Sequence, residues 1–356
     1  MSKVDSTIKI GSFTLKNRIT MAPTVKFDYT DDSGLVTDKL VEHYEKRAKG
    51  GAGLICVEAT AVLPGGRFGK NHMGLWDDSQ IEGQKRIVEA CHKYGAVTII
   101  QLNHIGCGAH PDLGPSIGPS DLEYEMWGHK VVTHGLTLEE LHDMQKAFTD
   151  AAVRAQKAGY DGVQLHGCHG YLINQFISVN NNKRSDEYGG SPENRARFAS
   201  EIISEIREKC GKDFLISVRT TGCEPTVEDA ITVGEEYVKA GCDYLQVSTG
   251  MTSLDSLPDY PDSEIDKTNS LGVYFKKHFD GRVPVSCVGG IKTAEKVRHI
   301  LENDLCDTVD IARELLADPE FANAVIQEKE YKICYGCKAC QYGPFTKHMC
   351  PCGNTP

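Results

Sequence analysis

The sequence predicts a closed (β/α)8 barrel of the α/β class, a TIM barrel, and three observations support this expectation. Eight short, strongly apolar segments alternate with amphipathic helical segments along nearly the whole chain. The apolar segments are continuous runs, as expected for parallel strands that are buried on both faces. Polar side chains gather where these segments end, which is where barrel enzymes place their active sites. A doubly wound open sheet is the alternative, although no Gly-x-Gly-x-x-Gly motif follows a strand and opens a helix.

The elements follow one another regularly. A β-hairpin is expected at residues 8–15, where two short alternating runs flank Gly11-Ser12. The eight predicted strands lie at residues 18–23, 54–59, 97–102, 162–165, 215–219, 244–248, 285–288 and 308–311. The predicted helices lie at residues 37–48, 80–92, 138–158, 194–209, 227–239, 270–279, 293–301 and 319–327. We expect residues 1–330 to form the barrel and residues 331–356 to form a short Cys-rich C-terminal extension.

Composition excludes several classes of partner. The net charge is −11 and the pI is about 5.6, which argues against nucleic acids and anionic membrane surfaces. The sequence contains no run of about 18 apolar residues that would span a membrane, and its first residues show no apolar secretory core. Fourteen cysteines without an export signal fit a reducing compartment, so a cytoplasmic location is expected.

The chain is organised around the stretch HGCHGYLINQF, from His166 to Phe176. His166 and His169 stand three residues apart where the fourth predicted strand ends, and Tyr171 follows them. A helix, a short strand and then polar side chains is the layout of a catalytic loop in a barrel enzyme. The pair could instead be half of a zinc site with Cys168 between them, or two structural histidines at a turn.

Glycines and an arginine follow the last two predicted strands. Gly289 and Gly290 come after the seventh strand, and Arg313 comes after the eighth. Barrels often bind phosphate at this place through backbone N–H groups. A plain tight turn is the alternative for the two glycines.

Several motifs together resemble those of the Old Yellow Enzyme family of NADH:flavin oxidoreductases. They are KNRITMAP at 16–23, HGCHGYLINQF at 166–176, RSDEYGGSPENRARF at 184–198, CVGGI at 287–291 and ARELLADP at 312–319. The resemblance covers nearly the whole chain. It implies a (β/α)8 barrel that binds FMN at its carboxyl-terminal mouth.

The resemblance also implies a role for the residues at the strand ends. The isoalloxazine ring of FMN would be lined by Ala22, Pro23, Thr24 and Ala59. Gln101 would hydrogen-bond its pyrimidine edge, and Arg219 would lie by N1 and O2. The phosphate would be held by Gly289, Gly290, Ala312 and Arg313, although many relatives have Gly at the position of Ala312. Val25 stands where relatives carry Thr or Cys, so that side chain cannot donate a hydrogen bond to flavin O4.

The catalytic residues implied by the resemblance are those of the central stretch. His166 and His169 would donate hydrogen bonds to a substrate carbonyl, and Tyr171 would supply a proton. The expected reaction is that of an FMN-dependent ene-reductase, which transfers hydride from NAD(P)H to an activated C=C bond in a small enone or enoyl substrate. An amine dehydrogenase or demethylase is the main alternative. A non-catalytic metal-binding or electron-transfer subunit is a third.

Five of the cysteines lie between Cys334 and the end of the sequence. Cys334, Cys337 and Cys340 form a C-x2-C-x2-C run, and a distal cysteine would complete a [4Fe-4S] cluster. We expect Cys352 to be the fourth ligand and Cys350 the reserve, while a zinc knuckle is the competing interpretation. The family has an iron–sulfur branch that includes 2,4-dienoyl-CoA reductase and trimethylamine dehydrogenase. Members of that branch continue into an FAD-binding region, and without such a region an external electron carrier would be needed.

Overall fold

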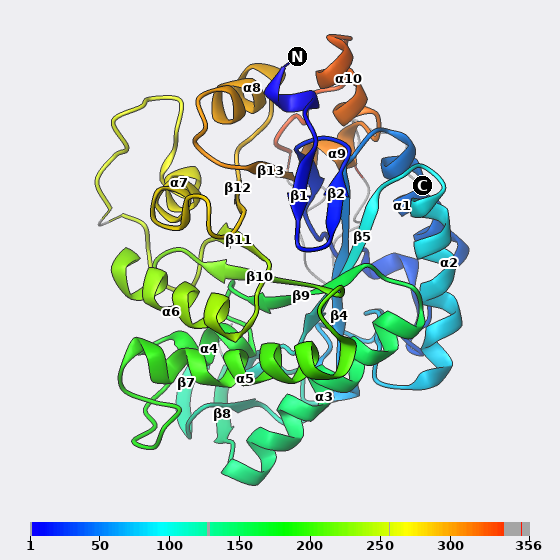
Figure 1. Cartoon of the computed structure of the whole chain (residues 1–356). Helices are drawn as coiled ribbons and strands as arrows, with labels where there is room; N and C mark the ends of the chain where they lie inside the picture. Colours follow the sequence, from blue (N-terminus) through cyan, green and yellow to red (C-terminus); the bar gives the residue numbers. More distant parts are fainter. Residues whose placement is uncertain (1, 127–128, 256, 338–349, 351–356) are drawn as a thin grey trace.

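The computed structural model describes residues 2–126, 129–255, 257–337 and 350, and a closed barrel of eight parallel strands forms its centre (Figure 1). The barrel strands are β3 (Ile19–Met21), β4 (Leu54–Ala61), β5 (Val97–Asn103), β9 (Gly162–Gly167), β10 (Leu215–Thr221), β11 (Tyr244–Ser248), β12 (Val285–Val288) and β13 (Thr308–Ile311). Pairing of β13 with β3 closes the ring. The predicted (β/α)8 barrel is confirmed, and the open sheet is excluded.

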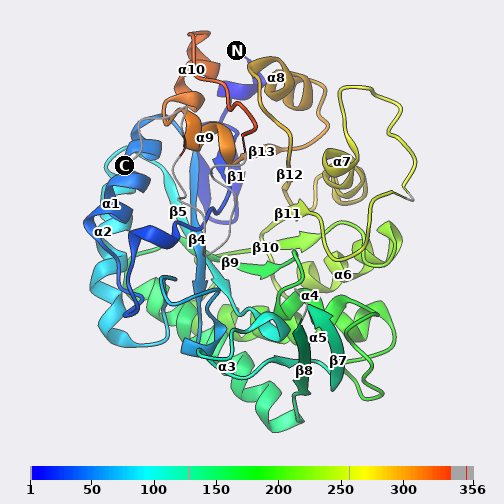
Figure 2. The same ribbon diagram turned by 180° about the vertical axis from the view of Figure 1, so that it is seen from behind.

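Helices surround the barrel on its outside (Figure 2). They are α1 (Asp38–Lys49), α2 (Ile81–His92), α3 (Leu138–Lys157), α5 (Pro192–Cys210), α6 (Val227–Ala240), α7 (Lys267–Phe279) and α8 (Ala294–Glu302), and α10 (Phe321–Gln327) follows the last strand. Helix α3 shows why they form, because its buried Leu141, Phe148 and Ala152 recur at helical spacing and face the core. Thr137 and Glu140 form a capping box at its start.

The N-terminal hairpin closes one end of the barrel. Strands β1 (Ile8–Ile10) and β2 (Phe13–Leu15) pair antiparallel, as predicted. Ile10 and Leu15 are buried in one cluster with residues at the start of barrel strands, among them Leu54 and Leu215. The amino-terminal mouth is therefore sealed with apolar side chains, and the carboxyl-terminal mouth is left for the site.

Three features were not predicted from the sequence. The excursion between β5 and α3 contains a separate small sheet of β6 (Ile117–Gly118), β8 (His129–Gly135) and β7 (Leu122–Met126), in that order. Two short helices, α4 (Leu172–Ile177) and α9 (Arg313–Ala317), follow β9 and β13 directly. All three lie at the carboxyl ends of strands and therefore shape the functional mouth.

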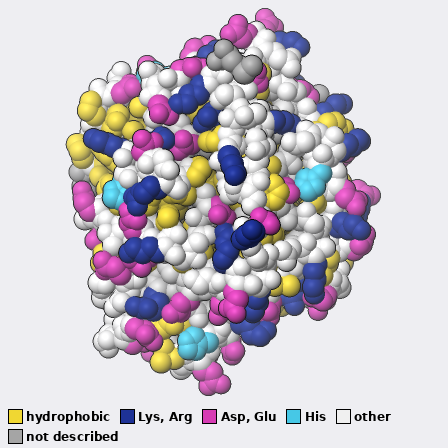
Figure 3. All heavy atoms as spheres, in the orientation of Figure 1, with side chains coloured by type: hydrophobic (Ala, Val, Ile, Leu, Met, Phe, Trp, Pro, Cys, Tyr) yellow, Lys and Arg dark blue, Asp and Glu magenta, His cyan; other side chains and the backbone are white. Residues whose placement is uncertain are grey.

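The outer surface carries both signs of charge. On the face shown in Figure 3, basic and acidic side chains are interspersed, and the basic ones form no continuous patch. Across the described ranges, no helix has the length and apolar character needed to cross a membrane.

His72 fixes the loop that follows β4. Its Nδ1 accepts a hydrogen bond from the backbone N–H of Phe68 at 3.2 Å, so Nε2 must carry the proton that it donates to the carbonyl oxygen of Ala59 at 2.6 Å. The ring is fully buried, and burial lowers its pKa to about 4. Protonation of Nδ1 would place two hydrogens against each other, so the fold requires the neutral ring.

We predict that replacing His72 reduces the acid sensitivity of the fold. Because the pKa of His72 is lower in the folded chain than in the unfolded chain, its contribution to stability is present above pH 6.5 and is lost as the pH falls towards 4. His72→Gln keeps a donor for Ala59 but cannot titrate. Between pH 7 and pH 5 the variant should lose about 2 kcal/mol less unfolding free energy than the wild type, measured by urea denaturation. Equal losses in the two proteins would contradict this assignment.

We also predict that β9, which carries His166, requires glycine at its first residue. A Cβ on Gly162 would lie 2.1 Å from the carbonyl oxygen of Leu215 on the paired strand. Gly162→Ala should therefore lower the unfolding free energy by about 1–3 kcal/mol or more, because backbone must move to admit the methyl group. Gly69→Ala is the matched control, since no atom lies within 4 Å of its added Cβ. Equal stability of the two variants would refute the prediction.

Candidate functional site

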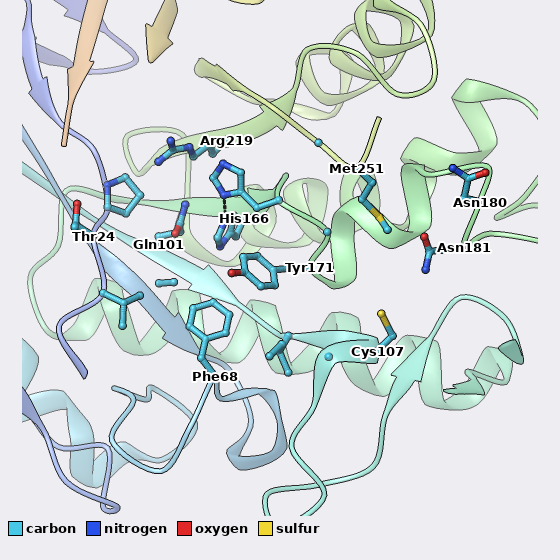
Figure 4. A pocket seen from close by; sticks show the side chains of 18 of the residues that line it. Thr24, Phe68, Gln101, Cys107, His166, Tyr171, Asn180, Asn181, Arg219 and Met251 are labelled. Carbon is cyan, nitrogen blue, oxygen red and sulfur yellow. Dashed lines mark hydrogen bonds between the residues drawn. The ribbon is translucent and has the colours of Figure 1, made fainter. Parts of the chain in front are cut away.

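A cavity of about 1060 Å³ opens at the carboxyl ends of the barrel strands (Figure 4). Most of the site residues predicted from the sequence line it: Pro23, Thr24, Ala59, Gln101, His166, His169, Tyr171, Arg219 and Ala312. Of the predicted flavin-binding residues, Ala22, Gly289, Gly290 and Arg313 do not reach the cavity wall. Predicted residues at the ends of six different strands are thus brought to one place by barrel closure.

The two histidines are bound to each other. Nε2 of His166 and Nδ1 of His169 lie 3.0 Å apart, and Nε2 of His169 lies 2.9 Å from Oγ of Ser248 on β11. His169 has a φ of 62°, in the left-handed region, and Gly170 follows with a φ of 80°. This turn aims the ring of His169 back at the strand that carries His166. Each neutral ring has one N–H, so the pair holds one inter-ring hydrogen bond and one further N–H.

Both rings are kept uncharged. Burial lowers the pKa of His166 well below its ordinary value, and His169 and Arg219 lower it further. The pKa of His169 is lowered by desolvation and by Arg219, because its ring nitrogens face inward although the residue is exposed at the cavity mouth. The pair can therefore donate hydrogen bonds at neutral pH but cannot hold an extra proton.

The phenol of Tyr171 projects into the cavity (Figure 4). Its ring lies between Phe68 and His166, with ring centroids 4.7 Å away on each side. Within the described chain its hydroxyl makes no hydrogen bond, and burial raises its pKa to about 12. The hydroxyl group therefore keeps its proton throughout the neutral range and is available to a ligand.

Arg219 and Gln101 form the polar floor of the cavity. Arg219 is buried, its Nη2 is 3.5 Å from Oγ of Ser248, and its Nε has no hydrogen-bond partner in the part of the chain that the structure describes. Gln101 donates from Nε2 to Oε1 of Gln164 at 2.7 Å, which leaves its own Oε1 for the cavity. A buried guanidinium with an unsatisfied N–H requires an acceptor, because leaving it unpaired is costly.

The segment after the first barrel strand contributes no side-chain donor to the cavity. The hydroxyl group of Thr24 donates to the backbone carbonyl of Ala22 at 2.9 Å. Val25 lines the cavity beside it with an apolar side chain. This edge can pack against a flat ring but offers it no side-chain hydrogen bond.

The predicted phosphate residues lie together beside the cavity. Val288 is paired with Asp310, so Gly289-Gly290 and Ala312-Arg313 follow the ends of adjacent strands. A Cβ on Gly289 would lie 2.8 Å from Cγ2 of Thr268, and both glycines have positive φ. Ala312 alone of these four reaches the cavity wall, and the side chain of Arg313 is exposed.

The predicted cluster ligands are only partly described. Cys334 and Cys350 are buried together against Ala317, and Cys337 is exposed. Cys340 and Cys352 lie outside the described residues. The structure therefore places Cys350, the predicted alternative to Cys352 as fourth ligand, beside Cys334.

One other group of potential metal ligands occurs among the described residues. The ligand atoms of His166, Cys168 and His169 lie within 4.8 Å of one another. Burial raises the pKa of Cys168 to about 12, and the permanently charged Arg219 lies nearby. The two histidine rings already hydrogen-bond each other, and a cation lies beside them, so we describe the pair as a hydrogen-bonding group.

Several cavity residues were not predicted. Phe68, Cys107, Asn180, Asn181 and Met251 also line the cavity (Figure 4). They lie in loops and a short helical turn that connect the barrel strands to the longer helices, where periodicity carries no information. Their position in the sequence, shortly after predicted strand ends, was the only signal available.

Comparison with known proteins identifies the family. The family model described as NADH:flavin oxidoreductase / NADH oxidase matches residues 6–332. The NADPH dehydrogenase of Halalkalibacterium halodurans is 38% identical over 323 residues, which cover 89% of this chain and 92% of that protein.

Solved structures give the same result. The Old Yellow Enzyme homologue of Zymomonas mobilis has a TM-score of 0.80 and 26% identity, covering 94% of this chain and 95% of its own. 2-Naphthoyl-CoA reductase in complex with 2-naphthoyl-CoA has a TM-score of 0.86 and 26% identity, covering 94% of this chain but only 54% of that longer chain. The fold, the family model and these relatives agree with the predicted resemblance, and the chain belongs to the NADH:flavin oxidoreductase / NADH oxidase family, as an oxidoreductase of the Old Yellow Enzyme type.

Proposed function

We propose that the chain is an FMN-dependent ene-reductase that uses NAD(P)H to reduce an activated C=C bond in an enone or enoyl substrate. The observation that carries the proposal is the cavity wall itself, where a neutral histidine pair and an unbound phenol face a floor with one buried cation. The family supports FMN and NAD(P)H as the redox partners. Bound FMN would carry the hydride between the nicotinamide and the substrate.

The residues present fit this cofactor. The buried Nε of Arg219 lacks a partner and would pair with an electron-rich edge of the isoalloxazine ring. Oε1 of Gln101 would accept a hydrogen bond from the same edge. Ala22, Pro23, Thr24 and Ala59 would support the ring, and Gly289, Gly290, Ala312 and Arg313 would hold the phosphate.

The histidine pair would stabilise negative charge that develops on the substrate oxygen. Since the inter-ring hydrogen bond uses one of the two N–H groups, an oxygen that accepts from both rings must displace that bond. Neutral donors suit this role because they lose no proton and need no counter-charge. Donors aimed at developing charge contribute about 10²–10³ in rate.

The alternative, an amine dehydrogenase or demethylase, has weaker support. Phe27, Phe68 and Tyr171 place aromatic rings on the cavity wall, where a methylated ammonium could bind. Among the described wall residues, however, the one carboxylate is Glu123, which is paired with Lys130 at 2.7 Å. The buried Arg219 would repel a cation, so a neutral substrate that gains negative charge is favoured.

We predict that Tyr171 supplies the proton to the substrate carbon. Tyr171→Phe should leave FMN binding and reduction by NADPH unchanged, but slow reoxidation by an enone about 10²-fold or more, measured by anaerobic stopped-flow absorbance. Tyr94→Phe, which removes a hydroxyl bound to Glu45 at the surface, is the control. An unchanged rate of reoxidation in Tyr171→Phe would assign the proton to another group or to water.

We further propose that residues 331–356 hold a [4Fe-4S] cluster through Cys334, Cys337, Cys340 and a distal cysteine, and that residues 1–330 form the flavin-binding barrel. The spacing of the first three cysteines supports this, and so does the burial of Cys334 beside Cys350. The cluster would exchange electrons with an external carrier or with an FAD-binding partner domain.

The cluster proposal predicts about four irons per chain after anaerobic purification, measured by elemental analysis. Cys334→Ser should lower the iron content. Comparing Cys350→Ser with Cys352→Ser identifies the fourth ligand, because only one of the two should lose iron. Finding one zinc ion and no iron would show that these cysteines form a structural zinc knuckle and not an iron–sulfur cluster.

A further inference from the structure

A chain of buried polar side chains crosses the barrel interior beneath the cavity. Gln101 donates to Gln164 at 2.7 Å, and Gln164 donates to the hydroxyl of Ser217 at 3.4 Å. Ser217 donates to Gln246 at 3.2 Å, and Gln246 donates to Oδ1 of Asp310 at 2.7 Å. These residues come from β5, β9, β10, β11 and β13, and all are at most 2% exposed. Polar groups this deeply buried must be paired, so the chain cannot be broken without cost.

The hydrogen bonds of this polar chain all run from donor to acceptor in one direction, which Asp310 determines. Oδ1 of Asp310 receives hydrogen bonds from Nε2 of Gln246 and from the hydroxyl of Thr20. A carboxylate oxygen only accepts, so Gln246 must turn its amide nitrogen towards Asp310 and its oxygen towards Ser217. Within the described residues Oδ2 makes no hydrogen bond, so a proton bound there would leave this direction unchanged.

Each of the remaining hydrogen bonds must then run in the same direction. With its hydrogen committed to Gln246, the hydroxyl of Ser217 must accept from Nε2 of Gln164. Gln164 then offers its oxygen to Nε2 of Gln101. The last amide is left with its oxygen towards the cavity. If the chain ran the other way, Gln101 would present an N–H donor there.

We propose that Asp310 is a positioning residue for the flavin site, because it orients the amide of Gln101 through Gln246, Ser217 and Gln164. The inference rests on the proposed function, in which Gln101 contacts FMN. The relevant partner is a ring N–H donor of FMN, which needs an acceptor on the protein. Burial raises the pKa of Asp310, and the nearby Arg219 offsets only part of this increase.

A double-mutant cycle on FMN affinity tests the inference. The probe is FMN itself, titrated into the deflavinated protein and followed by quenching of flavin fluorescence. Asp310→Leu and Gln101→Leu should each weaken binding about threefold to tenfold, the effect of one hydrogen bond. The double variant should bind no more weakly than Gln101→Leu alone, because Asp310 acts only through that residue. Asp310→Asn keeps an acceptor at Oδ1 and should restore binding close to that of the wild type.

Two further variants separate positioning from general damage to the fold. Gln246→Met interrupts the same chain one link away and should reproduce the coupling with Gln101, even where Asp310→Leu folds poorly. Thr98→Val removes a buried hydroxyl on the strand that carries Gln101 but outside the chain, and should leave FMN affinity unchanged. The position of the flavin absorbance band should shift in Asp310→Leu and not in Thr98→Val.

The outcomes are distinct. If Asp310→Leu weakens FMN binding by the same factor with and without Gln101, Asp310 has only a structural effect and the inference is wrong. If Gln101→Leu has no effect on affinity, the chain does not end at the flavin, which also overturns it. Failure of the wild-type protein to bind FMN would overturn the proposed function itself.

Discussion

The parallel register of the closed barrel is the constraint on which the site depends. Partners in register lie side by side on the same face of the sheet, so Gln101 lies beside Gln164, and His166 beside Arg219. Because the ring is closed, these neighbours form layers across the barrel interior. The buried polar chain that ends at Asp310 passes from Ser217 to Gln246, which is itself in register with Arg219. Arg219 and His166 stand two residues nearer the carboxyl ends of their strands than Ser217 and Gln164 do.

Burial and the charge of Arg219 determine the protonation states of the site residues. Burial lowers the pKa of both histidines, and the charge of Arg219 lowers it further because burial removes most screening. Burial also raises the pKa of Tyr171 to about 12. Throughout the neutral range the two histidines are therefore uncharged and Tyr171 keeps its proton, beside the guanidinium of Arg219. Such a site suits the proposed substrate, which gains negative charge during the reaction.

The sequence predicted the barrel well, because strands buried on both faces have an unmistakable pattern. Residues 244–248, 285–288 and 308–311 were predicted with the bounds that the structure shows. The small sheet of β6, β7 and β8 was not predicted, because its strands are short and lie within a single excursion. Helix α4 was also not predicted, since all six of its residues are buried and no amphipathic pattern marks it.

The residues of the candidate site likewise fall into a group that the sequence could predict and a group that it could not. Residues at strand ends, such as Gln101 and Arg219, could be predicted because the barrel fixes where a strand ends. Phe68 and His72 could not be predicted, because their positions depend on the path of a loop. That loop is held by a hydrogen bond from His72 to Ala59 and one from Phe68 to His72. The hydrogen-bonded polar chain to Asp310 could not be predicted either, since a single polar residue within an apolar strand gives no indication of its partner.

Anaerobic stopped-flow absorbance of the purified wild-type protein tests the central claim most directly. The claim is that the site passes hydride from NAD(P)H to an activated alkene. Addition of NADH or NADPH should bleach the flavin band, and subsequent addition of an enone should restore it, while trimethylamine should leave the oxidised band unchanged. Bleaching by trimethylamine together with no recovery on addition of enones would contradict the account and favour an amine dehydrogenase.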